Sequence, residues 1–348
     1  MRFDSNSYLK WYMPRMRRDD AVNLHASGVP SLTPADIELR PYDPWRVAEE
    51  FEPALAAWLG IDAESVLFTP GATGGTLLAL LSLTAAGDEL LVELPTYEPM
   101  LRQAARVGNV RRFRRSPESG WQLPVDEIGR LLSPRTKLVM ITEPSNPSGT
   151  FARREDVLAV ADLAATRGAL VLVNEVYLGF SERPTLCGAR DNIVVVSSLS
   201  KLLGAYWLRL GWLAARPDLV QRLRWGHMNL SMATKPAAAY GLGVLARADE
   251  WRARARATAA AGLEPVDRWV RATPGVSWIK PQGPGFGCVR LPDGVADDVA
   301  FAEKLQDELR VLVVPGTHFE LPGTLRLSWL QAGDRLQEGL ERISRALR

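Results

Sequence analysis

The sequence predicts an α/β protein with three layers: a mainly parallel seven-stranded sheet covered by helices, followed by a smaller α+β domain. Short runs of β-branched and other apolar residues recur between residues 65 and 214, and stretches with apolar residues at helical spacing separate most of them. Strands that alternate with helices form parallel sheets with helices on both faces. After residue 275, shorter strand-like and helical stretches follow in a different order, which indicates the second unit.

Each element of the large domain is predicted from its own pattern. Strands are expected in short runs of four to six residues, most of them apolar or β-branched, at 65–68, 89–93, 137–142, 169–174, 193–197 and 210–214, and also at 110–114, where Val110 and Phe113 stand among arginines. Helices are expected where apolar residues recur three and four positions apart, at 45–59, 75–85, 124–132, 154–167 and 218–225.

The segment 240–271 is rich in Ala and Arg and predicts one long helix that leaves the large domain, with a break near Gly262. The small unit is expected to contain strands 276–280, 285–290, 311–314 and 324–328, a helix at 297–308 and a final helix from Gly333. We therefore divide the chain into an N-terminal segment that joins the small domain (1–34), a large domain (35–245), and an interdomain helix with the small C-terminal domain (246–348).

Composition excludes several classes of protein. The 348 residues are 47% hydrophobic and 24% charged, with 42 basic and 40 acidic side chains, so a nucleic-acid partner is not expected. A signal peptide and an apolar stretch of ~18 residues are both missing, and two cysteines form no framework, which predicts a cytoplasmic protein without a membrane partner. Three histidines without ligand spacing predict no metal site.

Lys201 follows the predicted strand 193–197, at the end where α/β sheets bind ligands. It lies in Ser198-Leu199-Ser200-Lys201, and Arg209 comes eight residues later. An amine held among hydroxyls near a cation suits a Schiff base with an aldehyde cofactor beside a phosphate site. A lone lysine in such a segment is otherwise an exposed surface residue, so Lys201 by itself leaves both interpretations open.

Other motifs follow other predicted strands. Gly71-Ala72-Thr73 opens a helix whose N-terminal N–H groups could bind a phosphate, although a plain strand-to-helix turn has the same composition. The remaining motifs are Pro-Thr-Tyr at 95–97, Glu-Pro-Ser-Asn-Pro-Ser-Gly-Thr at 143–150 and Asn-Glu-Val-Tyr at 174–177.

With Lys201, these motifs resemble the class I/II aminotransferase family of fold-type I pyridoxal-phosphate enzymes, from about residue 24 to the end. The resemblance implies pyridoxal 5'-phosphate as the cofactor and a homodimer as the active unit. It implies that Lys201 is the catalytic residue, which holds the cofactor as a Schiff base and then acts as general base at the substrate Cα. The other cofactor-binding positions that it implies are Ala72, Thr73, Tyr97, Asn146, Asn174, Tyr177, Ser198, Arg209 and Tyr42.

The resemblance also implies what these side chains contact. Tyr97 stacks on the pyridine, Asn146 and Tyr177 bind its phenolic oxygen, and Ala72, Thr73, Ser198 and Arg209 bind the phosphate. Tyr42 reaches the phosphate of a neighbouring subunit. On the substrate side, Gly28 belongs to a glycine loop, and Arg326 clamps the α-carboxylate of an amino acid.

Two positions depart from the family pattern. Asn174 stands where the family has an Asp whose carboxylate keeps the pyridine nitrogen protonated, so we expect a weaker electron sink and slower transamination. Trp207 stands where the family usually has Gly, and we expect its ring to pack within the large domain.

The predicted function is transfer of the amino group of an α-amino acid to a 2-oxo acid. Asn174 keeps two alternatives open: a lyase or cyclase of the capreomycidine-synthase type acting on an amino acid, and a non-catalytic pyridoxal-phosphate-binding protein. The histidines are expected to be structural, although His25 and His318 could line the substrate pocket.

Overall fold

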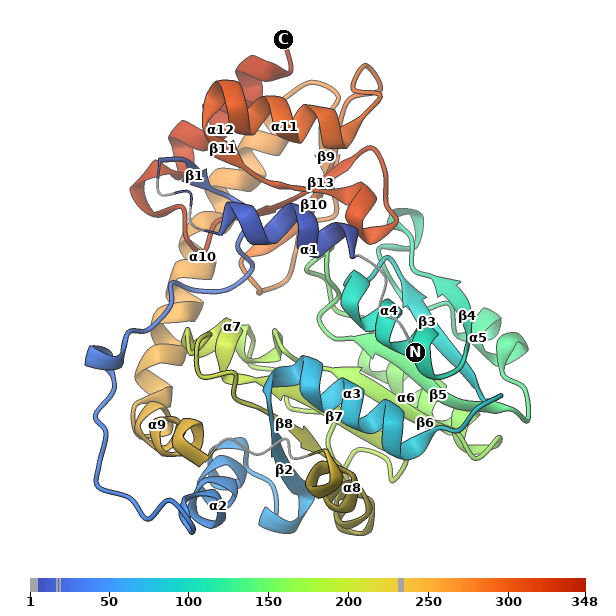
Figure 1. Ribbon diagram of the computed structural model, residues 1–348. Coiled ribbons are helices and arrows are strands. Elements are labelled where there is room, and N and C mark those ends of the chain that lie inside the picture. Colours follow the sequence, from blue (N-terminus) through green and yellow to red (C-terminus); the bar gives the residue numbers. More distant parts are fainter. Residues whose placement is uncertain (1–5, 17, 19, 231–234) are drawn as a thin grey trace.

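The computed structural model describes residues 6–16, 18, 20–230 and 235–348. Its largest sheet has seven strands in the order β2-β8-β7-β6-β5-β3-β4 (Figure 1). β8 runs antiparallel to both of its neighbours, and the other pairs are parallel. The strands are β2 (Val66–Thr69), β3 (Glu89–Leu94), β4 (Asn109–Arg114), β5 (Thr136–Thr142), β6 (Leu170–Asn174), β7 (Ile193–Ser198) and β8 (Gly211–Ala214). Each lies within one residue of its predicted bounds, so the predicted sheet is confirmed.

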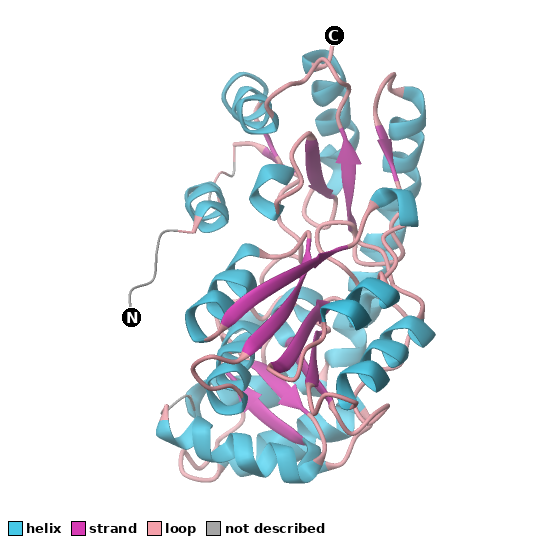
Figure 2. Ribbon diagram, turned by 90° about the vertical axis from the view of Figure 1, so that its right-hand side faces the viewer, coloured by secondary structure: helices cyan, strands magenta, loops and turns pink. Residues whose placement is uncertain are grey.

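Helices cover both faces of this sheet and complete three layers (Figure 2). One face carries α3 (Gly71–Leu83), α4 (Glu98–Val107) and α8 (Pro217–Asn229), packed on side chains such as Leu67, Leu90 and Val194. The other carries α2 (Val47–Leu59), α5 (Val125–Leu131), α6 (Arg154–Ala165) and α9 (Lys235–Ala246). Successive residues of a strand point to opposite faces, and in the central strands both faces are apolar, as a doubly covered sheet requires, whereas the edge strand β4 is mostly exposed.

Several helices differ from the sequence prediction, because α1 (Ser7–Tyr12), α4 and α7 (Leu199–Leu203) are not predicted and the predicted helix 240–271 is divided into α9 and α10 (Ala248–Ala272). In α4, Met100, Leu101 and Ala104 are buried at helical spacing, so the pattern of this helix is present in the sequence and the prediction overlooked it. The predicted break near Gly262 is wrong: the chain breaks at Arg247, and α10 (Ala248–Ala272) continues through Gly262. Gly262 has a packing reason instead, since a Cβ there would lie 2.1 Å from Cδ1 of Trp329.

The second unit is built on a four-stranded antiparallel sheet with the order β12-β13-β10-β9. Its strands are β9 (Ser277–Trp278), β10 (Phe286–Arg290), β12 (Val314–Pro315) and β13 (Thr324–Ser328), and α11 (Asp298–Leu309) and α12 (Leu336–Ala346) pack beside it. The predicted strand 311–314 is divided between β11 (Val311–Leu312) and β12, because β11 pairs with β1 (Val22–Asn23) instead.

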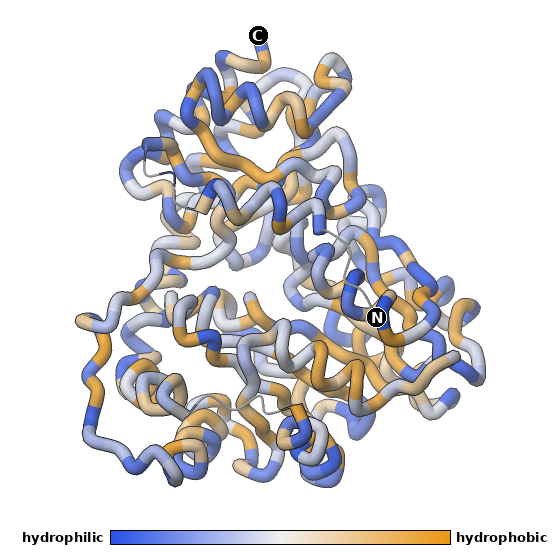
Figure 3. The backbone as a smooth tube through the Cα atoms, viewed as in Figure 1, coloured by the Kyte–Doolittle hydropathy of each residue, from blue (hydrophilic) through white to orange (hydrophobic). Residues whose placement is uncertain are grey.

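The N-terminal segment lies across both units. β1 adds a parallel strand to β11, and α1 (Ser7–Tyr12) buries Tyr8 and Trp11 in the core of the small unit. Figure 3 shows that the apolar residues gather in the central strands and in the helix faces that meet them. The boundaries at residues 34 and 245 stay a prediction.

Candidate functional site

The site lies at the carboxyl edge of the large sheet. β2, β5, β6 and β7 end at this edge, and register pairs Thr142 with Asn174 and Ser198 with Gly211. Because β8 runs the other way, the residues before it, including Arg209, lie at the same edge. One reversed strand therefore places Arg209 beside groups that follow the ends of parallel strands.

Lys201 projects from the short helix α7 (Leu199–Leu203), which begins directly after β7. Ser198 caps this helix by accepting a hydrogen bond from the Ser200 N–H, and the Lys201 carbonyl accepts one from the Val29 N–H. Burial, with smaller effects of the Arg326 and Arg209 charges, lowers the pKa of Lys201 to about 7. At neutral pH the Lys201 amine is therefore neutral in a large share of the protein molecules, and the neutral amine is the form that attacks an aldehyde.

An anion-binding cradle lies next to Lys201. Gly71 begins α3 with φ +72°, and a Cβ there would lie 3.1 Å from an Nη of Arg209. The N-terminal residues of α3, including Ala72 and Thr73, thus stand beside a guanidinium that has no side-chain partner among the described residues. A helix N-terminus and a free cation together suit a phosphate.

Arg326, on β13 of the small unit, lies close enough to Lys201 for its charge to lower the pKa of the lysine. It is fully buried and donates to Asn146 Oδ1 (3.1 Å) and to the His25 carbonyl (2.7 Å), whereas its Nε has no partner. None of the described carboxylates forms an ion pair with it. A buried cation without a counterion is stabilised by an anionic ligand, so this geometry suits a carboxylate.

The turn that carries Asn146 is anchored by a buried ionic network. Arg115 donates to Glu143 Oε1 (2.8 Å) and lies 3.4 Å from Glu93 Oε2. Glu143 also accepts from the Ala152 N–H, and Glu93 accepts from the Thr142 N–H. These bonds satisfy two buried carboxylates and fix the backbone on either side of Asn146.

Aromatic rings enclose the space near Arg326. Tyr8 of α1 stacks on Tyr12 (5.5 Å between centroids) and meets Tyr97 edge-on (5.1 Å), while Tyr177 Oη lies 2.9 Å from Ser27 Oγ. Glu98 holds α1 in place by accepting hydrogen bonds from Ser7 Oγ and from the Tyr8 N–H. The N-terminal helix therefore forms one wall of the site.

The two histidines that could line a substrate pocket both lie near this wall. His25 is buried against Tyr12, and burial lowers its pKa to about 3, so it is neutral. His318 Nδ1 lies 3.2 Å from Ser7 Oγ, and burial also lowers its pKa.

Asn174 and Trp207, the two departures from the family pattern, each form a hydrogen bond with the backbone. Asn174 is half-buried at the end of β6, and its Oδ1 accepts a hydrogen bond from the Val176 N–H (3.1 Å). Trp207 donates from Nε1 to the Leu32 carbonyl (2.8 Å) and packs edge-on against Tyr240. Trp207 therefore contacts the large unit beside the site, but it is 41% exposed, so it lies on the surface of the unit and not within it as expected.

The predicted site residues lie near one another at this edge of the sheet, with the exception of Tyr42. Gly28, Ala72, Thr73, Tyr97, Asn146, Asn174, Tyr177, Ser198, Lys201, Arg209 and Arg326 all lie along the carboxyl edge or in the segments that cover it. Tyr42 packs against the large core, and the contacts of the described residues do not join it to Lys201. Sequence reasoning missed Tyr12 and Tyr206, and for Tyr206 its place between Lys201 and Arg209 was an available signal.

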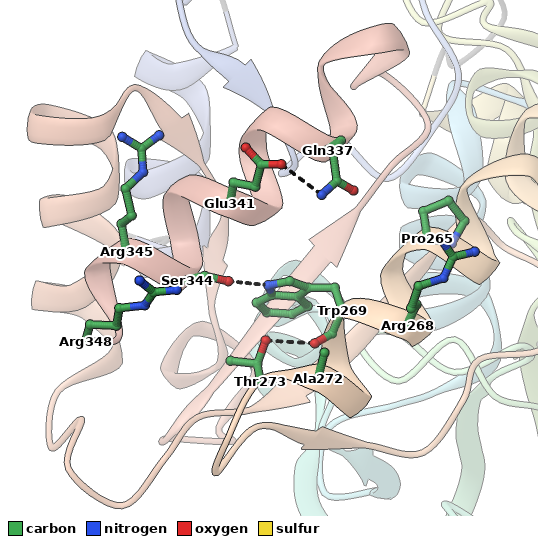
Figure 4. Close-up of a pocket in the computed structure, with 10 residues that line it drawn as sticks. All are labelled: Pro265, Arg268, Trp269, Ala272, Thr273, Gln337, Glu341, Ser344, Arg345 and Arg348. Atoms are coloured by element: carbon green, nitrogen blue, oxygen red, sulfur yellow. Dashed lines mark hydrogen bonds between the residues drawn. The ribbon is translucent and has the colours of Figure 1, made fainter.

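Other parts of the described chain offer less chemistry. A groove of about 610 Å³ between α10 and α12 has Trp269 at its centre, and its Arg268 and Arg345 side chains extend in different directions (Figure 4). Across the described ranges, His, Cys, Asp and Glu side chains form no group that could hold a metal. The helices among those residues are all too short or too polar to cross a bilayer.

A model of the family described as aminotransferase class I and II matches residues 34–343. The chain belongs to this family. An aspartate aminotransferase of Pyrococcus horikoshii is 26% identical to it, covering 83% of this chain and 77% of the relative. An aromatic-amino-acid aminotransferase of Thermococcus litoralis is 25% identical over 83% and 78% of the two chains. A crystal structure of a pyridoxal-phosphate-dependent aminotransferase from Streptococcus suis superposes with a TM-score of 0.88 at 27% identity, covering 100% and 98%.

This aminotransferase is thus a pyridoxal-phosphate-dependent enzyme that acts on amino acids and 2-oxo acids. Its own residues fit that cofactor: Lys201 offers an amine of lowered pKa for the aldehyde, and Arg209 with the start of α3 offers a cradle for the phosphate. The comparisons do not favour the lyase, cyclase or non-catalytic alternatives.

Proposed function

We propose that this aminotransferase carries out amino-group transfer with Lys201 as its catalytic residue and Arg326 as the clamp for the substrate carboxylate. The observation that carries the proposal is a buried lysine of lowered pKa that faces a buried arginine without a counterion. When bound, pyridoxal phosphate supplies the aldehyde and an electron-withdrawing ring. Lys201 then holds or moves the proton at the substrate Cα, while Arg326 fixes the carboxylate.

The other side chains keep the roles implied by the resemblance, as part of this proposal. Ala72, Thr73, Ser198 and Arg209 bind the phosphate, and Tyr97 lies against the ring. Asn146 and Tyr177 bind the phenolic oxygen, Asn174 lies at the pyridine nitrogen, and Gly28 contacts the substrate. Support comes from the shared edge and from the bond between Asn146 and Arg326, which would link the cofactor and substrate sides of the site.

We also propose that the active unit is a cytoplasmic homodimer in which Tyr42 contacts the partner's phosphate. Trp45 is 80% exposed, and Trp225 and Met228, three residues apart on α8, are each 62% exposed, so a second subunit that covered them would remove large apolar side chains from water. The proposed units are the segment 1–34, the large domain 35–245 and the helix with the small domain 246–348.

The proposal is tested with the cofactor-loaded protein. Amino acids are added one at a time and the visible band of the cofactor is followed. We expect one of them to convert the band to that of pyridoxamine phosphate, and a 2-oxo acid to restore it. Lys201→Ala should lose this exchange while Lys137→Ala, a half-buried lysine at the opposite end of β5 from the site, should keep it. Consumption of an amino acid without the change of band would overturn the proposal in favour of elimination or cyclisation.

A further inference from the structure

Tyr206 lies in the turn that joins the two groups flanking the cofactor site, Lys201 and Arg209. Its N–H donates to the Gly204 carbonyl and its carbonyl accepts from the Arg209 N–H. The ring is held against the lysine, with 5.1 Å between Lys201 Nζ and the ring centroid. A side chain so placed touches the space in which the lysine amine works.

The hydroxyl of Tyr206 is buried, and it has no hydrogen-bond partner among the described residues. Buried hydroxyls are nearly always paired, so an unpaired one indicates a missing acceptor or donor. Thr96, Ser145 and Ser200 also have unpaired hydroxyls, but Tyr206 Oη differs in what it faces.

Tyr206 Oη faces the glycine loop on the substrate side. A Cβ added at Gly28 would lie 1.9 Å from this oxygen and 3.0 Å from the Lys201 Cα. At position 28 only glycine leaves room for the Tyr206 hydroxyl, so the hydroxyl packs directly against the backbone of the glycine loop.

Arg326 approaches the same glycine loop, because it donates to the carbonyl of His25, three residues before Gly28. Burial is the largest cause of the raised pKa of Tyr206, followed by Tyr12, Tyr177 and Tyr8, and Arg326 opposes it. The phenol therefore stays protonated and acts as a donor. Arg326 Nε is a second buried donor without a partner. Both donors adjoin the segment that contains His25 and Gly28, and a carboxylate, whose two oxygens can accept from both, fits this arrangement.

We propose that Tyr206 is a substrate-positioning residue, whose hydroxyl donates to the carboxylate of the amino acid that Arg326 binds. The inference rests on the proposed function, because it takes the ligand to be an α-amino acid at Lys201. Tyr206 thus adds a second contact to the carboxylate clamp and restricts how the substrate sits beside the lysine amine.

The test compares Tyr206→Phe with the matched variant Tyr240→Phe in the cofactor-loaded protein. Tyr240 packs edge-on against Trp207, the neighbour of Tyr206, and among the described residues it forms no hydrogen bond or ring contact with Arg326. The probe is 2-methylalanine, which has an amine and a carboxylate but no hydrogen on Cα, and binding is read from the visible band. We expect Tyr206→Phe to weaken binding about 10- to 100-fold, as for loss of a hydrogen bond to a charged group.

A second probe, isopropylamine, is the same molecule without its carboxylate. Tyr206→Phe should leave its binding unchanged, and Tyr240→Phe should change neither probe. In steady state, the same loss should appear in KM for the best amino acid more than in kcat. Equal weakening of both probes, or binding of 2-methylalanine within twofold of wild type, would overturn the role of Tyr206. Wild-type protein that holds the cofactor but responds to no amino acid would overturn the proposed function, and this inference with it.

Discussion

The lowered pKa of Lys201 is the property at the residue scale from which the reactivity of the site follows. Its largest cause is burial, and Arg326 and Arg209 add to it. Folding therefore creates a nucleophile that is neutral near physiological pH, whereas an exposed lysine amine is almost fully protonated there.

We expect cofactor capture by the cofactor-free protein to follow this titration. Below pH 7 the Lys201 amine is protonated and unreactive, and the capture rate should rise as pH increases through about 7 and then level off. The measurement is the initial rate at which pyridoxal phosphate develops its visible band at each pH, with Lys201→Ala as the control for other lysines. A midpoint near 10.5, the ordinary value, would contradict the burial argument.

A second prediction concerns the rate of amino transfer when Asn174 is replaced by Asp. Its amide is neutral, so Asn174→Asp would place a carboxylate at the end of β6 with the Val176 N–H still available as a donor. A charge-assisted bond to the pyridine nitrogen is stronger than a neutral one, and we expect the amino-transfer rate to rise on the order of tenfold. Stopped-flow half-reactions measure it. Asn109→Asp, at an exposed position of β4, controls for added charge and should leave the rate unchanged. A slower Asn174→Asp variant would show that the amide is preferred.

At the element scale, α10 ties the two sheets together through close packing. Gly262 lies inside this helix, where glycine is unfavourable by itself, and yet the ring of Trp329 occupies the place of its side chain. Trp329 is held there by its Nε1, which donates to the Ala259 carbonyl (2.7 Å). The contact between helix and ring decides the residue, and helix propensity does not.

We expect Gly262→Ala to destabilise the fold by about 1–3 kcal/mol, because its Cβ would overlap the indole. Gly129→Ala in α5 should instead stabilise it by about 0.5–1 kcal/mol, since the nearest side-chain atom would be 3.5 Å away. Urea unfolding of the two variants measures both values. Equal stabilisation by the two substitutions would show that Trp329 moves aside at little cost.

At the scale of the whole molecule, the site combines residues of the large unit with residues of the small unit and the N-terminal segment, which lie over the edge of the large sheet. Arg326 comes from β13 and Tyr8 from α1, while Lys201 belongs to α7. Tyr42 stays apart from this cluster within one chain, which agrees with a role in the partner's site if the protein is a homodimer.

We expect sedimentation to give about twice the 38.4 kDa mass of the chain, and mixed dimers to reveal the shared site. A homodimer of Lys201→Ala subunits and a homodimer of Tyr42→Phe subunits are each expected to bind the cofactor more weakly than the wild-type protein. A hybrid of the two has one site with an intact Lys201 and an intact Tyr42, so it should recover wild-type cofactor affinity at half of its sites. Fluorescence titration of pyridoxal phosphate measures this recovery. Its absence in verified hybrids would place Tyr42 outside the partner's site.

Sequence alone determined the order of the large sheet's strands along the chain and the motifs after them, because buried strands carry local apolar runs and their ends carry turn residues. It also determined Lys201 and Arg326 as candidates through the family resemblance. Only the tertiary structure decided that helix α10 begins after Arg247, that β1 pairs with β11, and that Tyr206 lies against Lys201 with its hydroxyl at Gly28. These outcomes depend on contacts between segments far apart in the chain, which leave no periodic signal in either segment. The pKa of Lys201 has the same origin, since burial and two distant arginines set it.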